Sequence, residues 1–153
     1  MMTKTYQKAL RLFFLLLLTN GVGYVGSTFM TYDNMLWYQY LNKPILTPPN
    51  IVFPIMWTIL FFMMAIAAFL VWNKANPKYF TLSLMANLAW SFSFFYLRNT
   101  LAALVIILIY LFLLYMCIKV FYKASRMAAY LMIPTFIWCL FALYLNGYVV
   151  LFN

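Results

Sequence analysis

The sequence predicts an all-α integral membrane protein, a single bundle of five transmembrane helices over residues 1–153. Hydrophobic residues make up 69% of the chain and charged residues only 7%, and the mean hydropathy is +0.95. A soluble domain of this length needs far more charge to cover its surface. Five apolar segments also approach the roughly 20 residues that cross a ~30 Å hydrocarbon layer.

The five expected helices span about residues 9–30, 51–73, 79–97, 101–121 and 127–150. Short connections after the second segment predict antiparallel neighbours. Pro77 separates the second and third segments, and Pro134 is expected to kink the fifth helix or to mark its first turn.

The first segment also looks like the start of a secretory signal peptide, because basic residues precede its apolar run. No small-x-small cleavage site follows cleanly, so we expect a retained helix. Its glycines are expected to permit close contact between helices: Gly21, Gly23 and Gly26.

The basic residues predict a sidedness. Eight of them fall in the N-terminal tail and in the connections near residues 74–78 and 119–126, whereas Lys43 and Arg98 lie on the opposite side. Positive-inside bias therefore places the N-terminus in the cytoplasm and the C-terminus outside a bacterial-type cell membrane. Scattered beside apolar runs, these charges indicate contact with the lipid bilayer rather than with nucleic acid.

Several catalytic classes are excluded by composition. The chain has no histidine and one acidic residue, Asp33, so a histidine metal site, a Ser-His-Asp triad and a paired-carboxylate site are impossible within one chain. Asp33 is interpreted as a solvated turn residue. Cys117 and Cys139 lie in apolar segments without metal or disulfide spacing, and no metal site is expected.

Residues 37–49 form an aromatic, proline-rich segment just before the second apolar run. We expect an irregular loop there, and such a loop beside a membrane bundle must pack on protein or line a cavity. It is therefore the predicted lid of a binding site.

Three helical stripes mix large rings or an amide with small residues at spacings of three and four. They permit two interpretations, ordinary helix packing or the wall of a small-molecule pocket. The stripes are Trp57, Phe61, Met64, Ala65 and Ala68; Asn87, Ser91, Phe94 and Phe95; and Trp138, Phe141, Ala142 and Leu145.

Three motifs carry a resemblance to a known family. They run from Trp37-Tyr38 through Pro48-Pro49 to Trp57, over residues 86–95, and from Pro134 to Asn146. Together they resemble the translocator protein family, also called tryptophan-rich sensory proteins or peripheral-type benzodiazepine receptors.

The resemblance implies a usually homodimeric five-helix bundle that binds protoporphyrin IX, haem, isoquinolines and benzodiazepines. It implies no obligatory cofactor. Some bacterial members are reported to promote light-dependent porphyrin breakdown. By position it implies a lid and rim at Tyr38, Pro48 and Phe53, and walls at Trp57, Phe61, Asn87, Trp90, Trp138 and Ala142, with Trp57 and Trp138 facing a porphyrin in any photochemistry.

Two departures and two chemical limits qualify this expectation. Thr135 replaces a frequent family tyrosine, and no basic residue follows Tyr144 or Tyr148, so specific sterol recognition by the tail is not predicted. Lys43 is the predicted partner of a porphyrin propionate. Because the chain has no histidine to bind iron, metal-free porphyrin is favoured over haem. A tetrapyrrole receptor or sensor is the leading hypothesis; a light-dependent porphyrin-degrading enzyme and a porphyrin or lipid transporter are the alternatives.

Overall fold

The computed structural model describes residues 4–153, and within these residues the chain contains helices and connecting loops but no strands. Four helices are long and apolar enough to cross a membrane, namely α1 (Lys4–Thr28), α3 (Val52–Leu70), α5 (Thr100–Ala124) and α6 (Arg126–Phe152). The others are α2 (Tyr32–Tyr40), α4 (Lys78–Ser91) and the π-helix η1 (Phe92–Tyr96) that continues α4. The predicted membrane class and all-α fold are therefore confirmed, whereas α4 by itself is too short to count as a fifth span.

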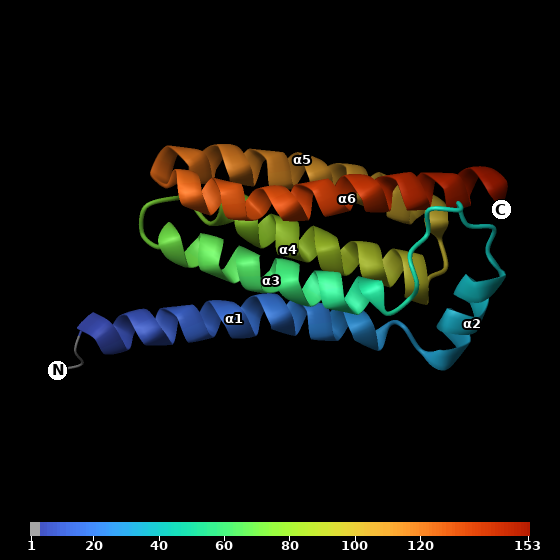
Figure 1. Ribbon diagram of the computed structural model, residues 1–153, viewed down its shortest axis with the longest axis horizontal. Helices are drawn as coiled ribbons and strands as arrows, with labels where there is room; N and C mark the ends of the chain where they lie inside the picture. The colour runs from blue at the N-terminus through green and yellow to red at the C-terminus, as the bar shows by residue number, and fades with distance from the viewer. Residues whose placement is uncertain (1–3) are drawn as a thin grey trace.

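The long helices lie alongside one another, with the start of α1 and the end of α6 at opposite ends of the bundle (Figure 1). α1 packs on α3 and α4, α3 packs on α6, and α5 packs on α4 and α6. Small and flexible side chains fill the core; Met64, Ala65, Leu114 and Met132 are completely buried. Many large apolar side chains on the outer faces are exposed, as expected for a surface that meets lipid.

The helix boundaries differ from the predicted ones by a few residues. α1 begins as early as Lys4, and α3 ends at Leu70 rather than near residue 73. The early end has a local cause, because Asn73 adopts a left-handed backbone with φ of 63° that an α-helix cannot continue. Pro134 lies inside α6 rather than in its first turn.

The prediction that residues 37–49 form an irregular loop throughout is wrong, because α2 contains Trp37 and Tyr38. Thr31 is the N-cap of α2, and its side chain accepts a hydrogen bond from the Asn34 N–H at 3.4 Å. Asp33 lies exposed in the first turn, where a negative charge favours the helix. Irregular chain begins only at Leu41.

Candidate functional site

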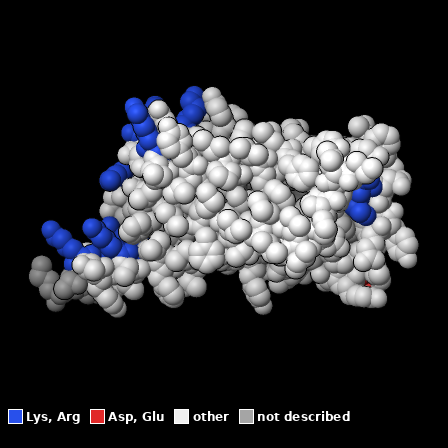
Figure 2. All heavy atoms as spheres, in the orientation of Figure 1, with Lys and Arg blue, Asp and Glu red and all other residues white. Residues whose placement is uncertain are grey.

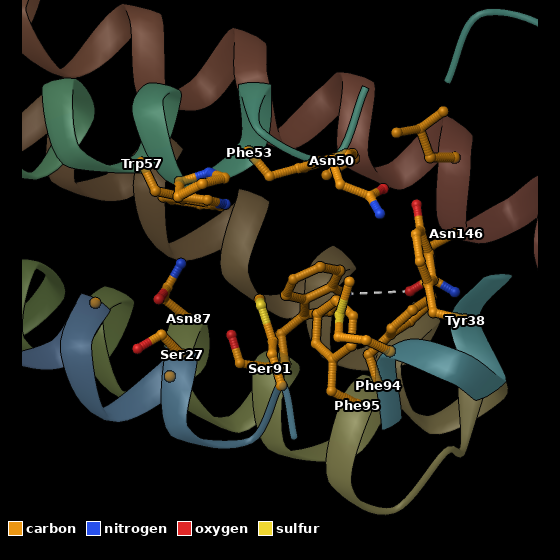
Figure 3. A pocket seen from close by; sticks show the side chains of 18 of the residues that line it. Ser27, Tyr38, Asn50, Phe53, Trp57, Asn87, Ser91, Phe94, Phe95 and Asn146 are labelled. Carbon is orange, nitrogen blue, oxygen red and sulfur yellow. Dashed lines mark hydrogen bonds between the residues drawn. The ribbon is translucent and has the colours of Figure 1, made fainter. Parts of the chain in front are cut away.

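A cavity of about 570 Å³ lies beneath α2 and the following loop, between α1, α3, α4–η1 and α6. Its size falls in the usual range for small-molecule sites. Eight of the residues that line it are aromatic, and a few amides and hydroxyls face the same space (Figure 3).

The wall from α3 consists of Phe53, Trp57 and Phe61, one helical turn apart. The rings of Trp57 and Phe61 stack with centroids 5.4 Å apart. Phe61 is only 3% exposed, so this pair is a fixed apolar surface rather than a mobile one.

The opposite wall comes from α4 and η1. Trp90 stacks on Phe94 at 5.4 Å between ring centroids, and Phe94 meets Phe95 edge to face at 5.0 Å. Consecutive residues of an α-helix point about 100° apart, yet both phenylalanines contact Tyr38, at 6.2 and 5.9 Å. The wider turn of the π-helix brings both rings to the cavity, and such turns are frequent at functional sites.

One buried amide, on α6, holds this wall in place. Asn146 of α6 accepts a hydrogen bond from the Trp90 indole N–H at 3.1 Å and donates to the Thr100 carbonyl at 2.9 Å. Asn87 of α4 is 4% exposed, and its side chain faces the cavity (Figure 3). Asn146 therefore has, within the bundle, the hydrogen-bond partners that an amide in a membrane helix needs.

The lid of the cavity is formed by Tyr38 and the loop from residue 41 to residue 50. The Tyr38 ring is 8% exposed, and its hydroxyl points away from α2 into the space that Asn50 also faces (Figure 3). Burial raises the pKa of Tyr38, so the hydroxyl remains a proton donor at neutral pH.

Lys43 lines the cavity, but its ammonium group is used by the protein itself. It donates to the carbonyl oxygens of Tyr38 (2.6 Å), Leu41 (3.1 Å) and Gln39 (3.2 Å), and it lies 4.6 Å from the Tyr38 ring centroid. These contacts satisfy its three hydrogens and the free carbonyls at the C-terminus of α2. Burial also lowers the pKa of Lys43. In this conformation Lys43 caps a helix and offers no hydrogen to a carboxylate.

The lid is also fixed from outside. The Asn42 N–H donates to Asn153 Oδ1 at 2.8 Å, and Asn153 Nδ2 donates back to the Asn42 carbonyl at 3.1 Å. On the other side of the lid, Arg98 donates two hydrogen bonds, at 2.9 and 3.1 Å, to the Asn34 side-chain oxygen.

Eight of the ten residues expected to bind ligand line the cavity, and Pro48 and Trp138 do not. Pro44 and Thr47 line the cavity, whereas Pro48 does not, and the turn between these two residues is closed by a hydrogen bond from the Thr47 N–H to the Pro44 carbonyl at 2.9 Å. The Trp138 ring lies against Phe53, 6.0 Å between ring centroids, and of these two residues Phe53 lines the cavity. The eight lining residues are Tyr38, Lys43, Phe53, Trp57, Phe61, Asn87, Trp90 and Ala142.

The contribution of α1 was missed. It supplies Asn20, Gly23, Tyr24, Gly26 and Ser27 to the wall. The sequence did contain a signal for this, because Asn20 and Ser27 occur among glycines in an apolar run. Polar side chains in a membrane helix face the bundle interior or a cavity.

Comparison with known proteins agrees with the motifs. The model of the TspO/MBR family matches residues 13–151. The chain is 39% identical to Tryptophan-rich protein TspO of Chlorobaculum tepidum, covering 82% of this chain and 85% of that one. It is 34% identical to the protein of the same name from Archaeoglobus fulgidus, over 87% and 90%. It is also 30% identical to the human Translocator protein, over 80% and 78%. The chain therefore belongs to the TspO/MBR family.

Proposed function

We propose that this protein is a membrane receptor or sensor that binds a tetrapyrrole, protoporphyrin IX above all, in the aromatic cavity. The observation that carries the proposal is the pair of facing walls, Trp57–Phe61 on α3 and Trp90–Phe94 on α4–η1, each stacked at 5.4 Å. A flat aromatic ligand gains ring contacts from such surfaces. The same walls suit the isoquinoline and benzodiazepine ligands that the family resemblance implies.

The polar end of the cavity supports an orientation for the ligand. The Tyr38 hydroxyl and the Asn50 amide face the cavity on the lid side (Figure 3). Both can donate hydrogen bonds to carboxylates, whereas the Lys43 ammonium group is occupied. We therefore place the propionates at the lid and the apolar macrocycle edge toward Asn87.

Metal-free porphyrin remains favoured over haem. The sequence offers no imidazole, and neither cysteine is among the residues that line the cavity. Met30, Met35 and the tyrosines Tyr24 and Tyr38 are the lining side chains able to approach an iron.

The proposal includes a topology. Taken together, α4 and η1 run from residue 78 to residue 96, long enough to act as the fifth span. The basic end of the bundle is then cytoplasmic. We also propose a homodimer. Small residues on α4, Ser83, Ala86 and Ala89, do not form its interface as one stripe, because Ser83 and Ala86 are buried inside the protomer.

The test is a titration of the purified full chain with protoporphyrin IX, followed by tryptophan quenching. Trp57→Phe removes an indole from the cavity wall, and Trp72→Phe is the matched control in the turn that follows α3. We expect weaker binding for Trp57→Phe, roughly three- to tenfold, and wild-type affinity for Trp72→Phe. Equal affinities for both variants would refute the cavity as the porphyrin site.

Illumination of the same complex separates the alternative enzyme class. A receptor protects or quenches the bound porphyrin, whereas an enzyme converts many equivalents. Of the two tryptophans expected to face a porphyrin, Trp57 lines the cavity and Trp138 does not. Only Trp57 of this pair would therefore face the ligand in such a reaction.

A further inference from the structure

A second hollow lies at the opposite end of the bundle from the lid. This groove, of about 680 Å³, opens between α1, the turn after α3 and the start of α4. Phe14, Leu18, Ala68 and Phe80 form its apolar walls, with Phe121 of α5 at its base. Trp72 and Lys74 from the turn complete its rim.

The rim of the groove is cationic. Lys74 is exposed, and the Arg11 guanidinium lies 5.6 Å from the centroid of the Trp72 ring. Arg11 precedes Phe14 by one helical turn, which places it at the groove's outer edge. The Phe14 ring meets Trp72 edge to face at 6.4 Å, so the same indole joins the apolar wall to the charged rim.

These cations have no acidic partner within the chain. Lysine and arginine side chains gather at this end of the molecule (Figure 2), and the sole acidic side chain, Asp33, lies at the lid end in α2. The groove also lies where α3 ends and α4 begins, which is the height at which an apolar span meets headgroups. The balancing negative charge must come from outside the protein.

We propose that this groove binds one anionic glycerophospholipid, with an acyl chain along the apolar wall and its phosphate between Arg11 and Lys74. Guanidinium groups hold phosphate oxygens in pairs, and basic pockets between membrane helices recognise anionic headgroups. Lipid tails are as apolar as leucine, so the acyl chain gains little over bulk bilayer. The headgroup charge therefore decides selectivity.

The experiment uses the full chain in vesicles that contain brominated phosphatidylglycerol or brominated phosphatidylcholine. Bromine quenches nearby indoles, and the difference between the wild type and Trp72→Phe isolates the signal at Trp72. Each cation near an anionic headgroup contributes roughly fivefold in affinity. We expect phosphatidylglycerol to be preferred at Trp72 by at least that factor.

The variants are matched in charge. The double variant Arg11→Gln with Lys74→Gln should bring the preference for phosphatidylglycerol over phosphatidylcholine close to one. Lys74→Gln alone, in an exposed turn, should lower this preference about fivefold. Lys119→Gln with Lys123→Gln is the control, because these positions share the face of α5 opposite Phe121. Unchanged protoporphyrin affinity verifies that each variant is folded.

Three results would overturn the proposal. Equal quenching by the two lipids would show that the groove has no headgroup selectivity. An equal loss in the control pair would indicate a diffuse basic surface. Relief of quenching by inorganic phosphate at a few millimolar would identify a small-anion site instead of a lipid site.

Discussion

Gly23 offers a sharp test of how rigid the cavity wall is. A Cβ atom at this position would lie 2.6 and 2.8 Å from two carbons of the Phe61 ring. To restore an ordinary contact of 3.4 Å, the ring must recede by about 0.8 Å. It has little room to do so, because Phe61 is 3% exposed and stacked on Trp57. The Gly23→Ala substitution therefore displaces part of the cavity wall.

The size of the effect follows from two opposing terms. Overpacking a filled site costs about 1–3 kcal/mol, while replacing glycine by alanine in a helix gains about 1 kcal/mol. Gly21→Ala is the matched control on the same helix, because a Cβ there meets nothing within 4 Å. We expect Gly23→Ala to be about 1–3 kcal/mol less stable than Gly21→Ala.

The assay is thermal or denaturant unfolding in detergent, combined with protoporphyrin titration of both variants. If moving Phe61 costs about 1 kcal/mol in the complex, the affinity of Gly23→Ala falls roughly fivefold, whereas Gly21→Ala binds as the wild type does. Equal stability and equal affinity in the two variants would show that the Phe61 ring yields freely, and that the stacked wall is not fixed.

Two further predictions concern polar residues around the cavity. Asn146→Leu should lower the free energy of unfolding by about 1–3 kcal/mol, measured by thermal unfolding, because the half-buried Trp90 N–H and the Thr100 carbonyl lose their partner. Lys43→Met should lower the free energy of unfolding by about 1 kcal/mol through loss of the α2 cap. The same change should leave the preference for protoporphyrin over its dimethyl ester within about twofold, measured by parallel titrations.

Each of these two predictions has its own control and its own contrary outcome. Gln7→Leu removes an amide from the exposed first part of α1, so a comparable loss of stability there would deny Asn146 a special role. For Lys43→Met, a tenfold loss of the preference for protoporphyrin over its dimethyl ester would indicate that Lys43 binds a propionate.

Much of the fold could be predicted because lipid imposes one rule on every span. Backbone polar groups must be satisfied within the segment, so apolar runs of sufficient length locate the helices to within a few residues. Trp57, Asn87 and Ala142 reach the same cavity for a related reason, since each lies on a face that helical spacing defines. The signals of α2 were also present, in the Thr31 cap and in Asp33, but the aromatic and proline content outweighed them.

Side-chain competition for the same space could not be predicted. Trp138 and Ala142 are one helical turn apart on α6 and share a face, yet only Ala142 reaches the cavity. The Phe53 ring from α3 lies across Trp138, with an angle of 64° between the ring planes. Which of two aromatic side chains faces a cavity depends on the offset between two helices, and periodicity within one helix carries no information about that offset.

The lid shows the same limit for polar residues. A lysine in a loop beside a cavity suggests a ligand for carboxylates, but Lys43 follows the end of a nine-residue helix, and the free carbonyls there bind its ammonium group first. The Asn42–Asn153 and Arg98–Asn34 bonds join positions 111 and 64 residues apart. No local sequence pattern around an asparagine indicates which distant residue it will bond. The position of the lid thus follows from tertiary contacts, and these polar contacts hold the Tyr38 ring over the aromatic walls.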